Sequence, residues 1–381
     1  MTSHASPASP SRVRLDFLDV VRFAAMVFMV QGHTLDALVR ADQLDVTAFP
    51  WNLWHALRGL TAPMFLLLSG AVGCLVLGRG ADGRVPARRL LHRAGWGLKL
   101  LALGYLLVFP ANRLADLRWL SPDVWRGFLQ VGILQLNGLL LLVLTGLAAL
   151  TRSDRAYAAW ALGLGAALVL ATPFVARVDC FACLPEAFAA FLSPAHGSLF
   201  PLFPHGAYLL LGVGIGQALK GRSRDEALDR FLDICDFGGA AALGLSALLA
   251  RGLPPIHDAT GLGLAFTFSR LGFALLLMGL VARLARRAPA FAGAVAPLGR
   301  RSLAVYVGHL LLLYGLPWIH GVAQARYRSM SLAEGFAAVA LVGGLTFGGV
   351  AVMDLIQRRA APLNALLRLS TAALLAWALV F

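Results

Sequence analysis

Long apolar runs recur along this sequence from residue 17 to its last residues. A membrane-spanning helix needs about 20 predominantly apolar residues, and about ten or eleven stretches approach that length. They lie near residues 17–37, 56–77, 96–112, 128–150, 156–176, 201–219, 236–251, 262–282, 302–319, 333–354 and 364–381. Only 14% of the residues are charged, whereas a soluble domain carries roughly 25%. The sequence therefore predicts an all-α, polytopic integral membrane helix bundle with about 10–11 transmembrane helices.

The chain divides into a short tail and one membrane domain. Residues 1–14 are rich in Ser and Pro, a composition typical of disorder. The first apolar run is too long for the core of a signal peptide and contains Arg22, so we expect it to be retained as a helix. Because no hydrophilic stretch is long enough to form a soluble domain, residues 15–381 are expected to form a single transmembrane domain.

The distribution of basic residues predicts the orientation of the chain. With the N-terminus inside, 22 of the 33 Lys and Arg residues fall on the cytoplasmic side and 8 on the other, while Arg22, Arg58 and Arg270 lie at or within membrane depth. This bias is the positive-inside pattern, and it predicts a cytoplasmic tail. The net charge of +14 arises from short basic clusters between apolar runs, not from the aromatic-interleaved basic face of a nucleic-acid-binding protein.

The first apolar run carries two ionisable residues, which are costly in a bilayer unless they are paired or hydrated. Arg22 and His33 are eleven positions apart, which places them on one helical face and about 16 Å apart along the axis. Asp19 lies three residues before Arg22, and Asp36 three after His33, so both can pair on that face. A carboxylate beside His33 would orient the ring for general-base catalysis. The alternative is two structural salt bridges.

The second apolar run contains a proline and a polar neighbour. Pro63 within a transmembrane helix frees a backbone carbonyl, and Ser69 can bond part of the released backbone. His55 precedes this run beside Trp51 and Trp54, where an aromatic anchor at the membrane interface is the simpler interpretation.

Amide and glycine residues mark two further runs. Gln130, Gln135 and Asn137 place three amides near or within an apolar helix, where they either join neighbouring helices or line a substrate channel. Gly212 and Gly216 form a GxxxG pair, which is typical of close helix packing.

Two ionisable residues lie deep in later runs. Arg270 is about eight residues from the end of its run, which is too deep for its side chain to reach the interface fully. His309 is similarly deep, with Tyr306 one turn before it. We interpret both Arg270 and His309 as functional rather than structural residues.

The loop after the fifth run contains Cys180 and Cys183. On the oxidising side of a membrane this pair is expected to form a local disulfide. Two cysteines without a second pair do not make a zinc site, so no metal is expected.

Five segments resemble a known group of membrane enzymes. Asp19–Arg22 followed after ten residues by His33, and Pro63–Gly70, resemble the first- and second-helix motifs of the integral-membrane acyltransferase-3 superfamily. Three later segments are similar to the heparan-alpha-glucosaminide N-acetyltransferase catalytic-domain branch, including its uncharacterised bacterial members: Gly132–Gln135, Phe200–Pro204 leading to Gly212, and Leu298–His309.

The resemblance implies transfer of an acyl group, usually acetyl, from cytoplasmic acyl-CoA to a sugar or glycan acceptor outside a bacterial inner membrane. Acyl-CoA is then a co-substrate, and no cofactor is bound permanently. The catalytic roles carry over onto Arg22 and His33, whereas Asp36 is a catalytic candidate because of its spacing from His33. The sequence departs from the pattern because Phe23 replaces a glycine, and because characterised members place their active histidine in the loop after the first helix, which makes His55 a rival.

The remaining polar residues fit this chemistry in two groups. Substrate-binding candidates are Arg270, His309, Gln135, Tyr306 and Ser69. Because CoA is polyanionic, basic residues expected on the cytoplasmic side are candidates for binding it: Arg88, Arg89, Arg300 and Arg301.

Two other functions stay open. A transporter or flippase would use His33, Arg270 and His309 as a substrate or proton path, although no internal repeat supports it. A scaffold subunit would tolerate replacement of these residues. The sequence leaves the oligomeric state open, with a homodimer among the alternatives.

Overall fold

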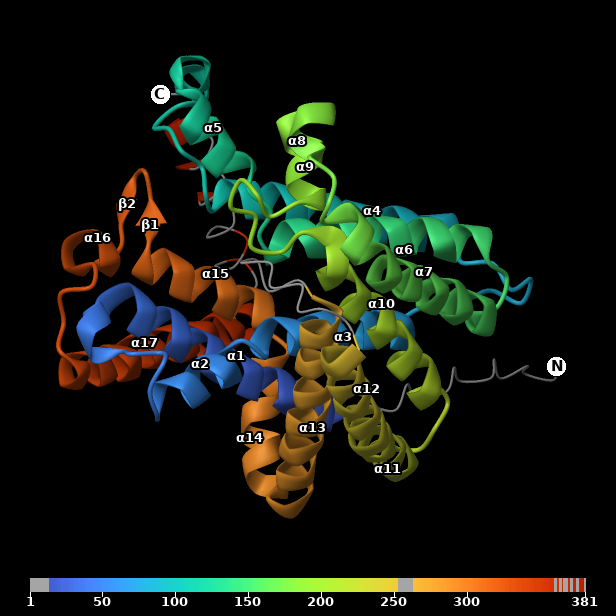
Figure 1. Cartoon of the computed structure of the whole chain (residues 1–381). Helices are drawn as coiled ribbons and strands as arrows, with labels where there is room; N and C mark the ends of the chain where they lie inside the picture. The colour runs from blue at the N-terminus through green and yellow to red at the C-terminus, as the bar shows by residue number, and fades with distance from the viewer. Residues whose placement is uncertain are drawn as a thin grey trace.

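The computed structural model describes residues 14–252 and 263–359, and scattered residues beyond 359. Within these ranges the chain is almost wholly helical, and its strands are limited to the short hairpin of β1 (Gly315–Leu316) and β2 (Ile319–His320). Figure 1 shows long helices gathered into one bundle. The predicted all-α fold is confirmed.

The helices vary widely in length. The longer ones are α1 (Asp16–Leu38), α3 (Thr61–Leu75), α4 (Ala87–Leu106), α6 (Ile133–Leu150), α7 (Asp154–Val175), α10 (Leu202–Leu219), α12 (Gly239–Gly252), α13 (Leu264–Arg287) and α17 (Leu332–Arg359). The shorter ones are α2 (Trp51–Arg58), α5 (Pro122–Leu129), α8 (Cys180–Cys183), α9 (Glu186–Leu192), α11 (Arg224–Asp233), α14 (Pro289–Gly299), α15 (Ser302–Leu313) and α16 (Val322–Arg326). Short 3-10 helices occur at η1 (Ala41–Gln43) and η2 (Leu114–Trp119), and a π-helical segment occurs at η3 (Ile234–Gly238).

Eight helical segments in the described ranges are long and apolar enough to cross a membrane. They are α1, the α2–α3 segment Trp51–Leu75, α6, α7, α10, the α11–α12 segment Arg224–Arg251, α13 and α17. The chain is therefore a polytopic membrane protein, as predicted.

Two predicted spans differ from the structure. The run at 96–112 falls on α4, which begins nearer the N-terminus and carries three arginines and a lysine in its first thirteen residues. The run at 302–319 falls on α15, which ends at Leu313 because the chain then turns into the β1–β2 hairpin. The last predicted span, 364–381, and the predicted disordered tail lie largely outside the described residues.

Glycines bring α3 and α10 into close contact at the centre of the bundle. A Cβ atom added to Gly70 would lie 1.9 Å from the carbonyl oxygen of Leu209, and one on Gly212 would lie 2.0 Å from that of Leu67. Gly216 would clash in the same way with Ala71, at 2.3 Å. The GxxxG pair therefore serves close helix packing, as its spacing predicts.

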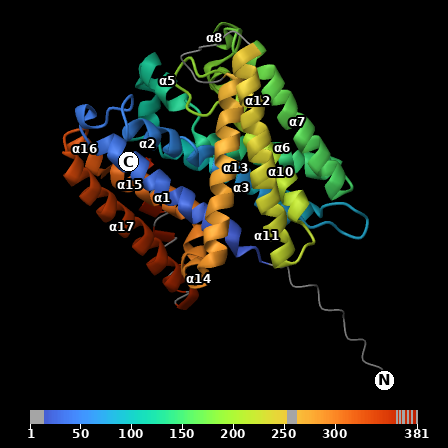
Figure 2. The same cartoon turned by 60° about the horizontal axis from the view of Figure 1, so that its bottom comes forward.

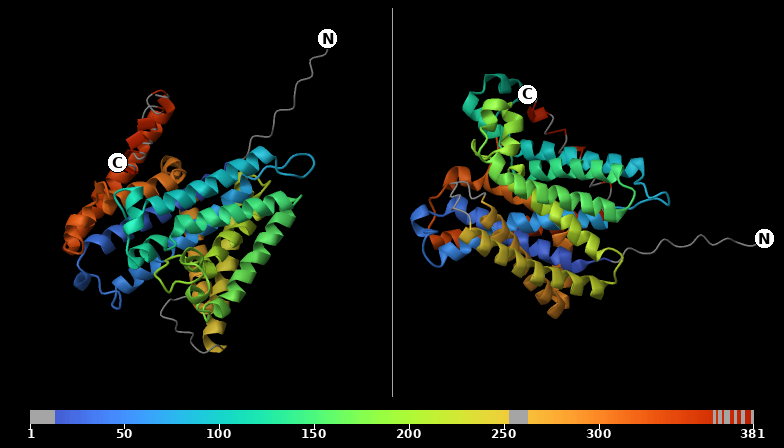
Figure 3. Two further views of the ribbon diagram at one scale, coloured as in Figure 1. Left: turned by 90° about the horizontal axis from the view of Figure 1, so that it is seen from above. Right: turned by 45° about the vertical axis from the view of Figure 1, so that its right-hand side comes forward.

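The other helices pack on both flanks of this pair. α7 packs against α10, α4 pairs with α6, and α12 pairs with α13. α1 contacts α3 and α13 and also α14 and α17, and Figure 2 shows α1 and α17 running side by side. The two views in Figure 3 show α4, α6 and α7 together on one flank.

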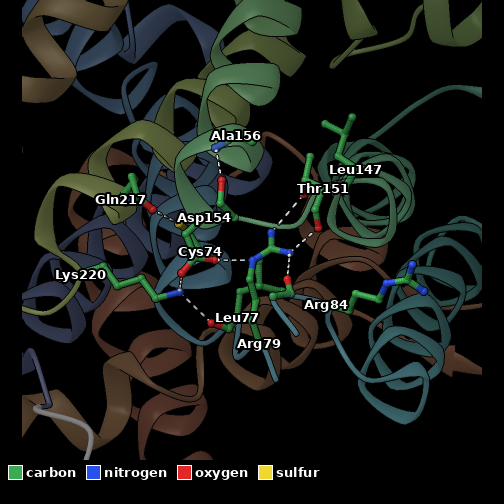
Figure 4. A network of polar contacts seen from close by, with 12 residues as sticks. Cys74, Leu77, Arg79, Arg84, Leu147, Thr151, Asp154, Ala156, Gln217 and Lys220 are labelled. Atoms are coloured by element: carbon green, nitrogen blue, oxygen red, sulfur yellow. Dashed lines mark hydrogen bonds and ion pairs between the residues drawn. The ribbon is translucent and has the colours of Figure 1, made fainter. Parts of the chain in front are cut away.

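A polar network ties together the ends of several helices (Figure 4). Asp154, at the start of α7, accepts from Arg79 Nε at 2.8 Å and from Lys220 Nζ at 2.5 Å. Arg79 also donates to the backbone and hydroxyl oxygens of Thr151, and Lys220 donates to the carbonyl of Leu77. The charges of Arg79, Asp154 and Lys220 are therefore paired with one another. We interpret this network as structural, because it joins the ends of α3, α6 and α10 to the start of α7.

The packing of α3 on α10 makes one substitution costly. We expect Gly212→Ala to lower the free energy of unfolding by about 1–3 kcal/mol, because the added methyl forces the two backbones apart. Gly163→Ala on α7 is the matched control, since nothing lies within 4 Å of its Cβ position. Thermal unfolding in one detergent compares the two, and equal midpoints for both variants would contradict this account of the packing.

Candidate active site

Two histidines from distant parts of the chain meet inside the bundle. His33 of α1 and His309 of α15 place Nδ1 and Nε2, respectively, 2.9 Å apart. Their rings stack at a centroid distance of 5.1 Å and an interplanar angle of 24°. The Tyr306 ring stands edge-on to His309 at 5.7 Å. His309 is fully buried and His33 is partly accessible, so the accessible ring of the pair is that of His33.

The sequence predicted a contact between Asp36 and His33, and this prediction is wrong. Asp36 forms an ion pair with Arg58 of α2 instead. Arg58 reaches it by lying across Gly32, whose absent side chain leaves room for the arginine stem at 3.3 Å from the Cβ position. A carboxylate is attracted more strongly by a full positive charge than by a neutral imidazole. Asp36 therefore pairs with Arg58 instead of His33, and His33 has His309 as its partner instead of Asp36.

Arg270 of α13 lies beside the end of α2, next to Arg58. Its Nη2 atom is 3.1 Å from the Cβ position of Gly59, which follows Arg58, and its guanidinium lies over the Phe266 ring at 4.3 Å. It interacts electrostatically with His205 and Tyr208 of α10. In the described ranges it forms no ion pair, in contrast to Arg22 and Arg58. Arg270 is therefore near the histidine pair through α2 but not in contact with it.

A different set of charges surrounds the beginning of α1. Arg22 pairs with Asp19 at 3.5 Å, and its Nη2 donates to the carbonyl of Leu68 in α3 at 3.4 Å. Arg300 approaches the same Asp19 at 3.6 Å. Gly299 permits this contact, because a Cβ atom there would lie 1.9 Å from the Asp19 carbonyl. The predicted Asp19–Arg22 pair is present, with Arg300 as a third member.

Arg22 also borders a cavity of about 410 Å³. α1, α3, α4, α6 and α10 line it with Arg22, Ser69, Val72, Gly73, Val76, His92, Arg93, Trp96, Leu100, Asn137, Leu141, Leu144 and Leu209. The wall is mostly apolar, with cationic and amide groups at a few points. This composition suits a ligand that has both an apolar part and anionic groups.

Arg93 is the residue of this cavity that the sequence interpretation missed. Its Nη1 donates to the Gly73 carbonyl at 3.0 Å, while Nε and Nη2 are buried without a hydrogen-bond partner in the described part of the chain. Buried guanidinium groups without partners are costly. Two nitrogens of Arg93 can therefore donate hydrogen bonds to a ligand that enters the cavity. The sequence interpretation missed Arg93 because the predicted span, 96–112, began after it, whereas α4 begins at Ala87 and includes it.

The predicted amides separate into two roles. Asn137 lines the cavity, and so does Ser69. Gln135 is 3% exposed and fills the space beside Gly104 between α4 and α6, and Gln130 donates to the His196 carbonyl at 3.0 Å. Asn137 and Ser69 face a ligand space, whereas Gln130 and Gln135 join segments of the chain.

The four arginines predicted to bind CoA fall into two groups, one exposed and one paired with carboxylates. Arg88 and Arg89 are exposed at the start of α4, one turn before His92 and Arg93 of the cavity. Arg300 is held by Asp16 and Asp19. Arg301 is paired with Asp354 of α17. Arg88 and Arg89 therefore remain available to an anion, whereas Arg300 and Arg301 have carboxylate partners.

Two further expectations concern His55 and the cysteine pair. His55 is exposed on α2; it interacts electrostatically with Arg58, Asp36 and Arg270, and it forms no hydrogen bond or ring contact with His33 or His309 in the described ranges. Cys180 and Cys183 do not form the disulfide that their spacing suggested; both thiols are free, Cys180 buried and Cys183 exposed, on one turn of α8. Burial raises the pKa of the Cys180 thiol, so this residue is the less reactive of the two.

Comparison with known protein families identifies the family of this chain. The family model of the heparan-alpha-glucosaminide N-acetyltransferase catalytic domain matches residues 14–243, more than half of the chain. The chain belongs to this N-acetyltransferase family. No curated protein matches the sequence.

The family match divides the candidate site. It covers α1 to α11 and the start of α12, and so includes Arg22, His33, Arg58 and every residue that lines the cavity. Arg270 and His309 lie beyond it. The acetyltransferase-like segment therefore supplies the accessible histidine, and the part of the chain after residue 243 supplies the imidazole that contacts it.

The Asp36–Arg58 pair gives a stability prediction. Asp36→Asn should lower the free energy of unfolding by about 1–3 kcal/mol, less than the roughly 3–5 kcal/mol for a fully buried pair, because both side chains are partly exposed. The double variant Asp36→Asn with Arg58→Gln should recover part of this loss, because no unpaired charge remains. Asp123→Asn, in an exposed ion pair with Arg126, should have almost no effect. A double variant as unstable as the two single variants summed would rule out this pairing.

Proposed function

We propose that this protein is a membrane-bound acyltransferase that moves an acetyl group from acetyl-CoA to an amino or hydroxyl group of a sugar or glycan. The observation that supports it most is the arrangement along α1. His33 contacts His309 through Nδ1 and keeps its other nitrogen free in the described part of the chain, while Arg22, about 16 Å away along the helix, borders a cavity with an unpartnered arginine.

The donor is proposed to occupy the cavity. CoA combines phosphates with a long, weakly polar pantetheine arm, and the cavity combines Arg22 and Arg93 with a mostly apolar wall. Arg88 and Arg89 extend the positive charge along α4 toward its exposed end, where they attract the nucleotide phosphates. The acyl-pantetheine arm then follows α1 from Arg22 toward His33.

The acceptor is proposed to react at His33. Nε2 of His33 removes the proton from the acceptor O–H or N–H while that atom attacks the thioester carbonyl. The carbon–sulfur bond breaks, and the CoA thiolate leaves and takes the proton from His33. In a two-step route, the same nitrogen attacks the thioester first, and the acceptor then attacks the acyl-histidine. Both routes use His33 Nε2.

The positive-inside distribution supports an orientation for this reaction. With 22 of the 33 basic residues on the side where α1 begins, that end faces the cytoplasm, where acyl-CoA is available. The His33 end then faces the outside of a bacterial inner membrane. The acetyl group is thus carried across the bilayer to an acceptor in the cell envelope.

Replacement of the two rival histidines tests this function. Purified protein is incubated with radiolabelled acetyl-CoA and either glucosamine or an envelope fraction, and CoA release and acceptor label are measured. We expect His33→Gln to lower kcat by roughly 10²- to 10⁴-fold, as for loss of a general base. His55→Gln should retain activity, because His55 is exposed and contacts neither histidine of the pair in the described ranges. Loss of activity only in His55→Gln would move the chemistry from α1 to α2. Absence of CoA release with every acceptor would favour transport over transfer.

The donor site is tested through Arg93. Arg93→Gln should raise the KM for acetyl-CoA by roughly 10- to 100-fold with a small change in kcat, because a hydrogen bond to a charged group contributes about 1.5–3 kcal/mol. Arg222→Gln is the matched control, since Arg222 is exposed and lies outside the cavity. Competition by CoA and by dephosphorylated pantetheine separates phosphate recognition from recognition of the arm. An unchanged KM in Arg93→Gln would remove the donor from this cavity.

A further inference from the structure

The contact of His309 with its own helix fixes the proton on one of its nitrogens. Nδ1 of His309 is 2.9 Å from the backbone carbonyl of Val305. A carbonyl oxygen can only accept a hydrogen bond, so Nδ1 must carry the proton. A neutral imidazole carries a single N–H. Nε2 of neutral His309 is therefore a lone-pair acceptor.

The same reasoning extends to His33. Its Nδ1 lies 2.9 Å from the lone pair of His309 Nε2, so Nδ1 of His33 must be the donor. Neutral His33 then carries no proton on Nε2. The His33 side chain is only partly buried, and Nε2 has no hydrogen-bond partner among the described residues. The histidine pair thus leaves a basic nitrogen free on the accessible ring.

We propose that His309 is a positioning residue that holds His33 in the Nδ1–H tautomer, through the chain Val305 C=O to His309 to His33. The inference rests on the proposed function, in which Nε2 of His33 is the reacting atom. It changes the role that the sequence suggested for His309, from contact with substrate to orientation of the base. Complete burial of His309 supports this change, because a residue without accessible surface cannot contact a substrate.

A neutral partner has a physical advantage at this depth. A carboxylate beside His33 would be a second charge in a region where charges are costly, and the carboxylate nearest in sequence, Asp36, is paired with Arg58. When His33 takes a proton on Nε2, its Nδ1–H remains bonded to His309, whose polarised Nδ1–H remains bonded to Val305. The base can then return its proton to the leaving thiolate without a carboxylate that retains it.

Nitrogen NMR of histidine-labelled protein tests the tautomer independently of activity. His33→Gln identifies the His33 signals by their loss. In the wild-type protein, we expect Nδ1 of His33 in the protonated range and Nε2 in the unprotonated range. His309→Gln, whose side-chain oxygen can accept at the position of Nε2, should retain this pattern, whereas His309→Leu should lose it. A wild-type His33 protonated at Nε2 would overturn the inference even if both His309 variants misfolded.

Kinetics then separates positioning from substrate binding. His309→Leu should lower kcat by roughly 10²- to 10⁴-fold, the range for loss of a base or of its correct tautomer, with the KM for acetyl-CoA and acceptor changed less than twofold. His309→Gln should recover kcat to within tenfold of the wild type. His320→Leu is the matched control, because His320 is exposed on β2. A raised acceptor KM with kcat retained would make His309 a substrate contact and overturn the proposal. The expected tautomer without any acetyl transfer would instead refute the proposed function alone.

Discussion

Lipid offers no hydrogen bonds, so every polar side chain at membrane depth must find its partner within the chain or in a hydrated space. This constraint determines how the bundle is arranged around α1. Asp19 is satisfied by Arg22 and Arg300, and Asp36 is satisfied by Arg58. Because Asp36 is paired with Arg58, His33 forms its hydrogen bond with His309 on α15 instead. The packing of α2, α14 and α15 against α1 is thus tied to three polar contacts.

Small residues make these contacts reachable. Gly32 leaves room for the stem of Arg58, and Gly299 lets α14 approach Asp19. A larger side chain at either position would hold the partner helix away and leave a charge unpaired, at a cost of several kcal/mol in a low-dielectric environment. The ion pairs of this fold therefore depend on its glycines, because the charged groups can pair only where a glycine permits the helices to approach closely.

Sequence reasoning found the helices and the important positions on α1, because apolar runs and unusual polar residues are local signals. It did not find the partners. His33 and His309 are 276 positions apart, and the choice between Asp36 and His309 as the partner of His33 depends on Arg58, which reaches α1 from another helix. Arg93 was missed because the charges of α4 shifted the expected span toward its apolar half. Partner choice is a property of packing, which neither composition nor spacing contains.

The two ends of α1 differ in a way that follows from the same constraint. At the Arg22 end, the polar groups border a cavity, and one of them, Arg93, is buried with two nitrogens unpartnered in the described ranges. At the His33 end, Asp36 and Arg58 pair with each other, and Nε2 of the neutral His33 ring has no hydrogen-bond partner among the described residues. A cavity with an unsatisfied cation can hold an anionic donor, whereas a neutral, oriented imidazole can take and return a proton. Because one helix carries both ends, its length sets the distance between donor binding and proton transfer in the proposed reaction, and the acyl-pantetheine arm of the donor has to span that distance.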